Sequence, residues 1–178
     1  MKASEHSDPA RAAHRSERFD VVVAGGGPAG LAAAISAAAL GARTLLVERS
    51  HLLGGNAANA FVHTICGLYL ADKPEPQAAH PGFPARFAAT LHAAGGAGEP
   101  EQAGRVWVLP TDPIRFAGVA ERACDEAKNL VVKRSCTVRN VHLGTEAAPH
   151  VLELGSPDPP PVFVRSRSEE HTSELQSQ

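Results

Sequence analysis

The stretch from Asp20 to Gly55, DVVVAGGGPAGLAAAISAAALGARTLLVERSHLLGG, is the most informative part of this chain. Three β-branched valines at 21–23 predict a strand that is buried on both faces of a parallel sheet. An alanine-rich segment after the glycines predicts a helix, and Thr44–Val47 predicts a second strand, which ends at Glu48. This order of elements is the layout of a dinucleotide-binding unit. The turn between the first strand and the helix consists of Gly25, Gly26, Gly27, Pro28, Ala29 and Gly30.

The glycines of this turn have separate predicted roles. Gly25 permits the tight turn out of the strand, Gly27 lets the backbone approach a pyrophosphate, and Gly30 lets the helix pack against the strand. The helix, expected from about Pro28 to Leu40, directs its free N–H groups and the positive end of its dipole toward the phosphates. Gly41 is placed to cap the far end of this helix.

Glu48 is predicted to bind the ribose of the nucleotide. It lies 18 residues beyond Gly30, close to the spacing of about 20 expected for the acid that accepts hydrogen bonds from an adenosine ribose. An acid at this position favours free ribose hydroxyls over a 2′-phosphate. A GxGxxG pattern alone also fits an ordinary loop, but the surrounding strands, helix and acid favour the nucleotide site.

The residues that follow the acid indicate a flavin. The glycine turn, Glu48 and the pair Gly54-Gly55 together resemble the FAD-binding half of the glutathione-reductase-like flavoprotein superfamily. The segments 54–57 and 62–69 resemble members in which a glycine pair precedes a CGLY-type segment. A second glycine-rich approach suits a long, extended cofactor that needs backbone contacts beyond one pyrophosphate turn. NAD as the main ligand stays open as an alternative.

This resemblance implies an α/β, Rossmann-like FAD-binding domain with three layers, a parallel sheet and a β-meander. FAD is the implied cofactor. The glycine turn and Glu48 would hold the ADP half, and the segment 54–56 would approach the pyrophosphate or the flavin. The segment around Thr137 and Val138 would supply backbone contacts to the adenine. The full predicted set is Gly25, Gly26, Gly27, Pro28, Ala29, Gly30, Glu48, Arg49, Gly54, Gly55, Asn56 and Val138.

No catalytic residue is predicted with a defined role. Cys66 could act as a thiol beside the flavin, but no resolving thiol lies nearby in the sequence, so a buried structural cysteine is favoured. His63 could donate or accept a proton, because its unperturbed pKa lies near neutrality, although a structural role is favoured. Tyr69 could pack near the flavin ring or in the core.

The rest of the chain predicts further elements in the order that the superfamily shows. The segment Ala71–Gly104 is rich in proline, alanine and glycine, which mostly excludes regular structure except a short helix near Pro84–Ala94. We interpret this segment as a surface excursion, with a lid near the flavin as the alternative. A helix capped by Thr111 or Asp112 is also expected. Strands are expected at 106–109, 130–133, 137–141, 150–154 and 162–164.

The domain boundaries follow from composition and from the resemblance. Residues 1–18 are interpreted as a disordered arm, and 19–165 as part of an FAD-binding domain. The stretch Arg167 to Ser177 resembles, residue for residue, the translation of a widely used short-read sequencing adapter. We therefore expect native sequence to end near Arg165 and 166–178 to be a non-native tail. The returning Ala-Thr-Gly-type strand and the substrate domain of the superfamily are absent from this sequence.

Composition excludes several other classes of protein. The 178 residues carry a net charge of −2 without long charge blocks, which favours neither nucleic acid nor an anionic membrane as a partner. Hydrophobic residues make up 43% of the chain, and no run is long enough to span a membrane. Three cysteines without a CxxC spacing predict neither a disulfide framework nor a metal site. We expect a soluble protein in a reducing cytoplasm.

Together these features predict part of a flavin-dependent oxidoreductase. By resemblance, the intact enzyme takes a hydride or an electron pair from a small organic substrate and passes it to a nicotinamide, oxygen or another acceptor. One alternative is a noncatalytic dinucleotide-binding module that serves as a subunit or sensor. Another is an inactive fragment, poorly soluble and weak in FAD binding because the sheet lacks a strand.

Overall fold

A computed structural model of the chain describes residues 17–145, 149–155 and 162–166. At its centre lies a parallel sheet of β2 (Val21–Ala24), β3 (Thr44–Val47) and β7 (Leu130–Lys133), in the order β2-β3-β7. All four residues of the central strand β3 are buried. The valines of β2 are only half-buried, which corrects the expected burial on both faces. Among the described strands, β2 pairs with β3 alone and forms an edge of this sheet.

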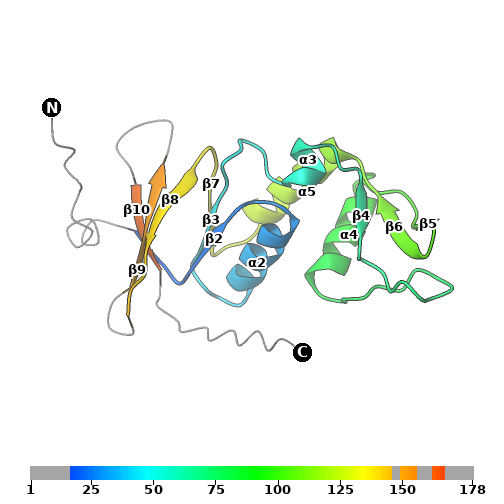
Figure 1. Cartoon of the computed structure of the whole chain (residues 1–178), viewed down its shortest axis with the longest axis horizontal. Coiled ribbons are helices and arrows are strands. Elements are labelled where there is room, and N and C mark those ends of the chain that lie inside the picture. Colours follow the sequence, from blue (N-terminus) through cyan, green and yellow to red (C-terminus); the bar gives the residue numbers. More distant parts are fainter. Residues whose placement is uncertain (1–16, 146–148, 156–161, 167–178) are drawn as a thin grey trace.

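Two helices cover one face of the parallel sheet (Figure 1). The first, α2 (Pro28–Ala39), ends at the C-cap Leu40, and Gly41 follows with a φ of 93°. The second, α5 (Pro113–Asp125), begins at Asp112, whose side chain accepts a hydrogen bond from the Arg115 N–H at 2.9 Å. Both predicted helices are therefore confirmed. Their core against the sheet includes Leu31, Ala34, Leu46, Phe116, Val119 and Ala120.

A second sheet covers the other face. It consists of β1 (Glu17–Phe19), β8 (Thr137–His142), β9 (His150–Gly155) and β10 (Val162–Ser166), in the order β1-β10-β9-β8. Strands β8, β9 and β10 form the expected antiparallel meander, and β1 adds to it in parallel. The core between the two sheets includes Phe19, Leu45, Val47, Leu152, Leu154 and Val164. The structure thus has the three layers that the sequence predicts.

The middle of the chain lies beyond the helices, on the side away from the meander (Figure 1). It contains α3 (Asn56–Asn59), β4 (Thr64–Cys66), α4 (Phe83–Ala93), β5 (Glu101–Ala103) and β6 (Val106–Pro110). The three strands form an antiparallel sheet in the order β4-β6-β5. Strand β6 and helix α4 are predicted from the sequence, whereas α3, β4 and β5 are not.

The predicted arm, residues 1–18, and the predicted tail, residues 166–178, overlap the described residues only at 17–18 and at 166. Glu17 and Arg18, the last residues of the expected arm, belong to β1, and Ser166 is the last residue of β10. The rest of the arm and of the tail lies outside the described residues. Within the described part of the chain, no helix combines the length and the apolar character needed to cross a membrane.

Candidate functional site

The glycine turn joins β2 to α2 with little room for side chains. Gly25 has a φ of 103°, a conformation that other residues rarely adopt, and its N–H donates to the Val47 carbonyl at 2.7 Å. A Cβ atom on Gly30 would lie 1.8 Å from the Gly25 carbonyl oxygen. Helix α2 therefore packs directly onto the turn that precedes it, and only glycine fits at this position.

The first turn of α2 is open to a ligand. The N-cap residue Gly27 provides no side-chain hydrogen bond to the helix, and Pro28 occupies the next position. The first turn contains no acidic residue. The backbone N–H groups at the start of a helix lack intrahelical acceptors, and the helix dipole adds a positive potential there. A phosphate group is the type of ligand that such a helix end favours.

The glycine pair packs against this turn through the backbone. Gly54 and Gly55 have φ values of 107° and 52°, and the Gly54 N–H donates to the Gly26 carbonyl at 2.8 Å. A Cβ atom on Gly55 would approach the Gly27 Cα to 2.8 Å. By contrast, a Cβ atom on Gly27 would have its nearest neighbour at 3.8 Å. The two predicted glycine segments thus form one backbone junction, and Gly27 keeps space beside it.

Glu48 is buried at this junction, with 6% of its surface exposed. One carboxylate oxygen, Oε2, accepts a hydrogen bond from the Gly26 N–H at 2.5 Å, and Oε1 accepts one from the Ser50 N–H at 2.7 Å. A carboxylate offers about four acceptor positions, so two remain for hydroxyl donors of a ligand. Glu48 therefore holds the glycine turn in place and still has acceptor capacity.

A first pocket, which we call the Glu48 pocket, lies beside this carboxylate. It has a volume of about 230 Å³. Four predicted residues meet here: Gly25, which follows β2, Glu48 and Arg49, which follow β3, and Val138, which belongs to β8. Ala24, Val47, Cys136 and Thr137 complete its lining.

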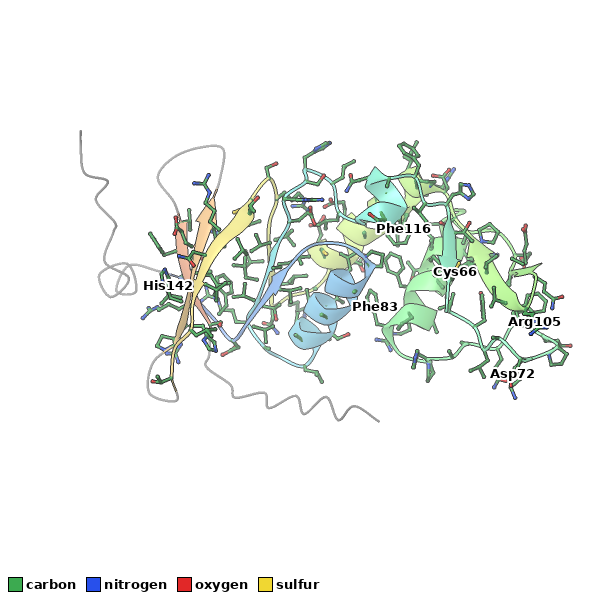
Figure 2. The ribbon with its side chains drawn as sticks, in the orientation of Figure 1. Cys66, Asp72, Phe83, Arg105, Phe116 and His142 are labelled. Atoms are coloured by element: carbon green, nitrogen blue, oxygen red, sulfur yellow. The ribbon has the colours of Figure 1, made fainter. Side chains whose placement is uncertain are left out.

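A second pocket, which we call the apolar pocket, has a volume of about 420 Å³. Three predicted residues line it, Pro28, Ala29 and Asn56. Its polar side chains are Asn56, Thr64 and Cys66, and the rest of its lining is apolar. Phe83, Phe116 and Cys66, labelled in Figure 2, belong to three different elements of its wall. The other predicted residues, Gly26, Gly27, Gly30, Gly54 and Gly55, do not line either pocket and form the backbone junction.

Of the three residues considered for catalysis, only Cys66 lines a pocket of the candidate site. Its thiol is free and exposed, so the favoured interpretation of a buried cysteine is wrong. Among the described strands, β4 pairs with β6 alone and lies at an edge of its sheet. His63 is exposed, with Nδ1 3.2 Å from Thr64 Oγ1. Tyr69 is half-buried and lines a different small pocket; burial and then the nearby Glu99 charge raise its pKa.

Sequence reasoning missed most of the apolar wall. Phe83, Phe87 and Phe116 come from α4 and α5 and meet through ring contacts, with centroids 5.5 Å apart for the first two and 5.1 Å for the last two. The local signals were the spacing of Phe83 and Phe87 by one helical turn and the position of Phe116 on the apolar face of its predicted helix. The contact between Phe87 and Phe116 joins two helices, and no local sequence pattern predicts it.

Comparisons with known proteins give a family match and two partial relatives. A protein-family model described as FAD dependent oxidoreductase matches residues 20–151. Dihydrolipoyl dehydrogenase of Trypanosoma brucei brucei is 56% identical over 41 residues, which cover 23% of this chain and 9% of that protein. Leghemoglobin reductase of Glycine max is 52% identical over 44 residues, covering 25% and 8% respectively. The matched stretch thus spans less than a tenth of each curated relative.

Solved structures resemble the chain over most of its length. A 3-ketosteroid-Δ4-(5α)-dehydrogenase from Rhodococcus jostii RHA1 matches 94% of this chain and 46% of its own, at a TM-score of 0.58 and 16% identity. THI4 from Thermovibrio ammonificans matches 84% of this chain and 55% of its own, at a TM-score of 0.55 and 18% identity. At these identities the likeness concerns the fold. The chain spans about half the length of these two proteins.

Proposed function

This chain belongs to the FAD-dependent oxidoreductase family, and from this premise we propose that residues 19–165 form the FAD-binding part of a flavin-dependent oxidoreductase. The observation that carries the proposal is the open start of α2 at Gly27, where the two glycine segments meet. Residues next to this junction line the Glu48 pocket and the apolar pocket. This arrangement suits an extended ligand with a charged middle and two different ends.

The described residues fit the parts of FAD. We assign the ADP half to the Glu48 pocket, where the carboxylate of Glu48 would accept hydrogen bonds from ribose hydroxyls. The backbone near Val138 would contact the adenine, and the start of α2 would face the pyrophosphate. The Glu48 carboxylate would repel the 2′-phosphate on the adenosine ribose of NADP⁺, so the site favours FAD over NADP⁺.

The apolar pocket suits the flavin end. Alanine, leucine, isoleucine and phenylalanine side chains dominate its lining, and Asn56 and Thr64 offer polar contacts there. FAD, when bound, supplies two-electron chemistry between an organic donor and an acceptor, and the protein orients the ring. We propose that a small-molecule substrate and a nicotinamide, oxygen or another acceptor reach the flavin from a part of the intact enzyme outside the described residues.

A titration separates FAD from the NAD alternative. The flavin-free chain would be titrated with FAD, NAD⁺ and NADP⁺ by isothermal calorimetry. We expect one FAD per chain and weaker binding of both nicotinamide dinucleotides, because the isoalloxazine ring of FAD would bury more apolar surface in the apolar pocket than a nicotinamide ring would. Tighter binding of NAD⁺ than of FAD would contradict the proposal.

The edge position of β2 bears on the strength of this binding. Because β2 has one neighbour among the described strands, and Ala24 and Gly25 at its end are exposed, one side of the site faces solvent. We therefore expect weaker FAD binding by this chain than by an intact family member. Tight stoichiometric binding by residues 1–165 would contradict that expectation.

A further inference from the structure

A half-buried ion pair connects two walls of the candidate site without lining either pocket. Arg134, between β7 and β8, donates from Nε to Glu121 Oε1 at 3.2 Å, and its Nη2 also donates to Glu121 Oε2. The Arg134 and Glu121 side chains are 32% and 26% exposed. The hydrogen bond with Glu121 raises the pKa of Arg134. This bidentate geometry fixes direction as well as distance.

Glu121 also holds the loop that carries the glycine pair. Its Oε1 accepts a hydrogen bond from the Leu53 N–H at 3.3 Å. Leu53 is fully buried, and its Cδ2 lies 2.6 Å from where a Cβ atom on Gly26 would be. The next residue, Gly54, donates to the Gly26 carbonyl at 2.8 Å. The Glu121 carboxylate thus connects helix α5 to the loop that forms the glycine junction.

Arg134 belongs to the opposite wall. The next residue, Ser135, donates its N–H to the Ser50 carbonyl at 3.0 Å, and the Cys136 N–H donates to the Glu48 carbonyl at 2.9 Å. Ser135 has a φ of 51°, which is uncommon for a residue other than glycine. Cys136 lines the Glu48 pocket. The guanidinium therefore anchors the segment that leads into the adenine side of the site.

We propose that the Glu121–Arg134 pair positions two walls of the candidate site, the glycine junction and the segment 134–136 beside the Glu48 pocket, for the adenosine half of FAD. The inference rests on the proposed function, because it assigns that half to this pocket. Glu121 and Arg134 are positioning residues, since they act through Leu53 and through the segment 134–136. Breaking the pair releases both walls at once, and we expect adenosine-half affinity to fall by about tenfold, or about 1.4 kcal/mol.

The test uses the full, flavin-free chain and variants Glu121→Gln, Arg134→Gln and the double variant. The probes are FAD and ADP, measured by calorimetry, with amide hydrogen exchange of Leu53 and Ser135 in the unliganded chain. We expect each single variant to weaken both probes about tenfold and the double variant to weaken them no further, because one interaction is lost in all three. Faster exchange at both amides is also expected.

A matched control separates positioning from stability. Asp112→Ala removes the N-cap of the same helix and should lower stability by about 1 kcal/mol without touching either wall. We expect it to leave the ADP dissociation constant within about twofold of the parent chain. Arg134→Lys, which keeps the charge but loses the bidentate geometry, provides a milder variant if the others fail to fold. It should still weaken ADP binding measurably.

Several outcomes would overturn the inference. Folded Glu121→Gln or Arg134→Lys with unchanged ADP affinity would show that the pair only stabilises the fold. An equal loss of ADP affinity in Asp112→Ala would show the same. A parent chain that binds neither FAD nor ADP would overturn the proposed function itself, and the inference with it.

Discussion

A Cβ atom on Gly55 would lie 2.8 Å from the Cα of Gly27, so two glycine segments separated along the chain meet backbone to backbone at the start of α2. The relationship is asymmetric. The Cβ position of Gly27 has no atom closer than 3.8 Å. Gly55, which also has a φ of 52°, is therefore required by the packing of the protein. At Gly27 the protein leaves space, and we assign this space to the ligand.

Gly30→Ala should damage the fold itself. Its Cβ atom would lie 1.8 Å from the backbone oxygen of Gly25, so α2 has to move away from the turn. We expect a loss of about 3 kcal/mol or more in the free energy of unfolding, measured by denaturant titration. Gly82→Ala is the matched control, because Gly82 precedes α4 with no atom within 4 Å of its Cβ position. Equal stability of the two variants would contradict the close packing of α2.

Glu48→Gln should weaken both the fold and FAD binding. An amide can accept a hydrogen bond from Gly26 or from Ser50 through its oxygen, but its NH₂ group then faces the other N–H. An unsatisfied buried donor costs about 1–3 kcal/mol, and we expect a loss of that size in urea unfolding. A variant as stable as the parent chain would show that these two hydrogen bonds do not hold the turn.

Stability should fall at alkaline pH because of Cys124. Burial, followed by the nearby charge of Glu121, raises the pKa of this thiol to about 11 from a usual 9.0. Between these values the unfolded chain has lost the proton and the folded chain retains it, so the free energy of unfolding decreases as pH rises from 9 to 11. Cys124→Ala should show a smaller decrease over the same range. Parallel pH profiles for the two proteins would contradict the assignment.

The three thiols should differ in reactivity. Cys66 is exposed, whereas Cys124 and Cys136 are buried. In the folded chain at pH 8 we expect iodoacetamide to modify Cys66 first, which peptide mass spectrometry would locate, and all three to react in urea. Because Cys66 lines the apolar pocket, saturating FAD should slow its modification. Modification of Cys124 or Cys136 at the rate of Cys66 would indicate that the native packing differs.

The elements with strong local signals could be predicted from the sequence. The valines of β2, the glycine turn, α2, β3 and Glu48 each carry their own signal, and the structure has them in the predicted order. The meander strands were also predictable as separate runs. Their partners were not: β1 pairs with β10 from the far end of the described chain, and no local pattern encodes that pairing.

The elements and contacts that the sequence did not predict have a common physical cause, because each of them depends on tertiary contacts. Helix α3 is a single turn after Gly55, stabilised by burial of Ala57 and Ala58. Strand β4 exists through its pairing with β6. The Leu53 contact with Glu121 joins residues 68 positions apart. The candidate site residues could therefore be predicted as types and positions, while the apolar wall and the Glu121–Arg134 ion pair became visible only in the fold.

The placement of the cofactor at the start of α2 is tested by an FAD titration of the flavin-free parent chain, Gly27→Ala and Gly27→Leu, followed by flavin fluorescence. We expect all three to fold, as judged by thermal unfolding, because the Cβ position of Gly27 is open. FAD affinity should fall at least about tenfold, or about 1.4 kcal/mol, in Gly27→Ala and be lost in Gly27→Leu. Folded variants that bind FAD as the parent chain does would contradict the placement of the cofactor at the start of α2.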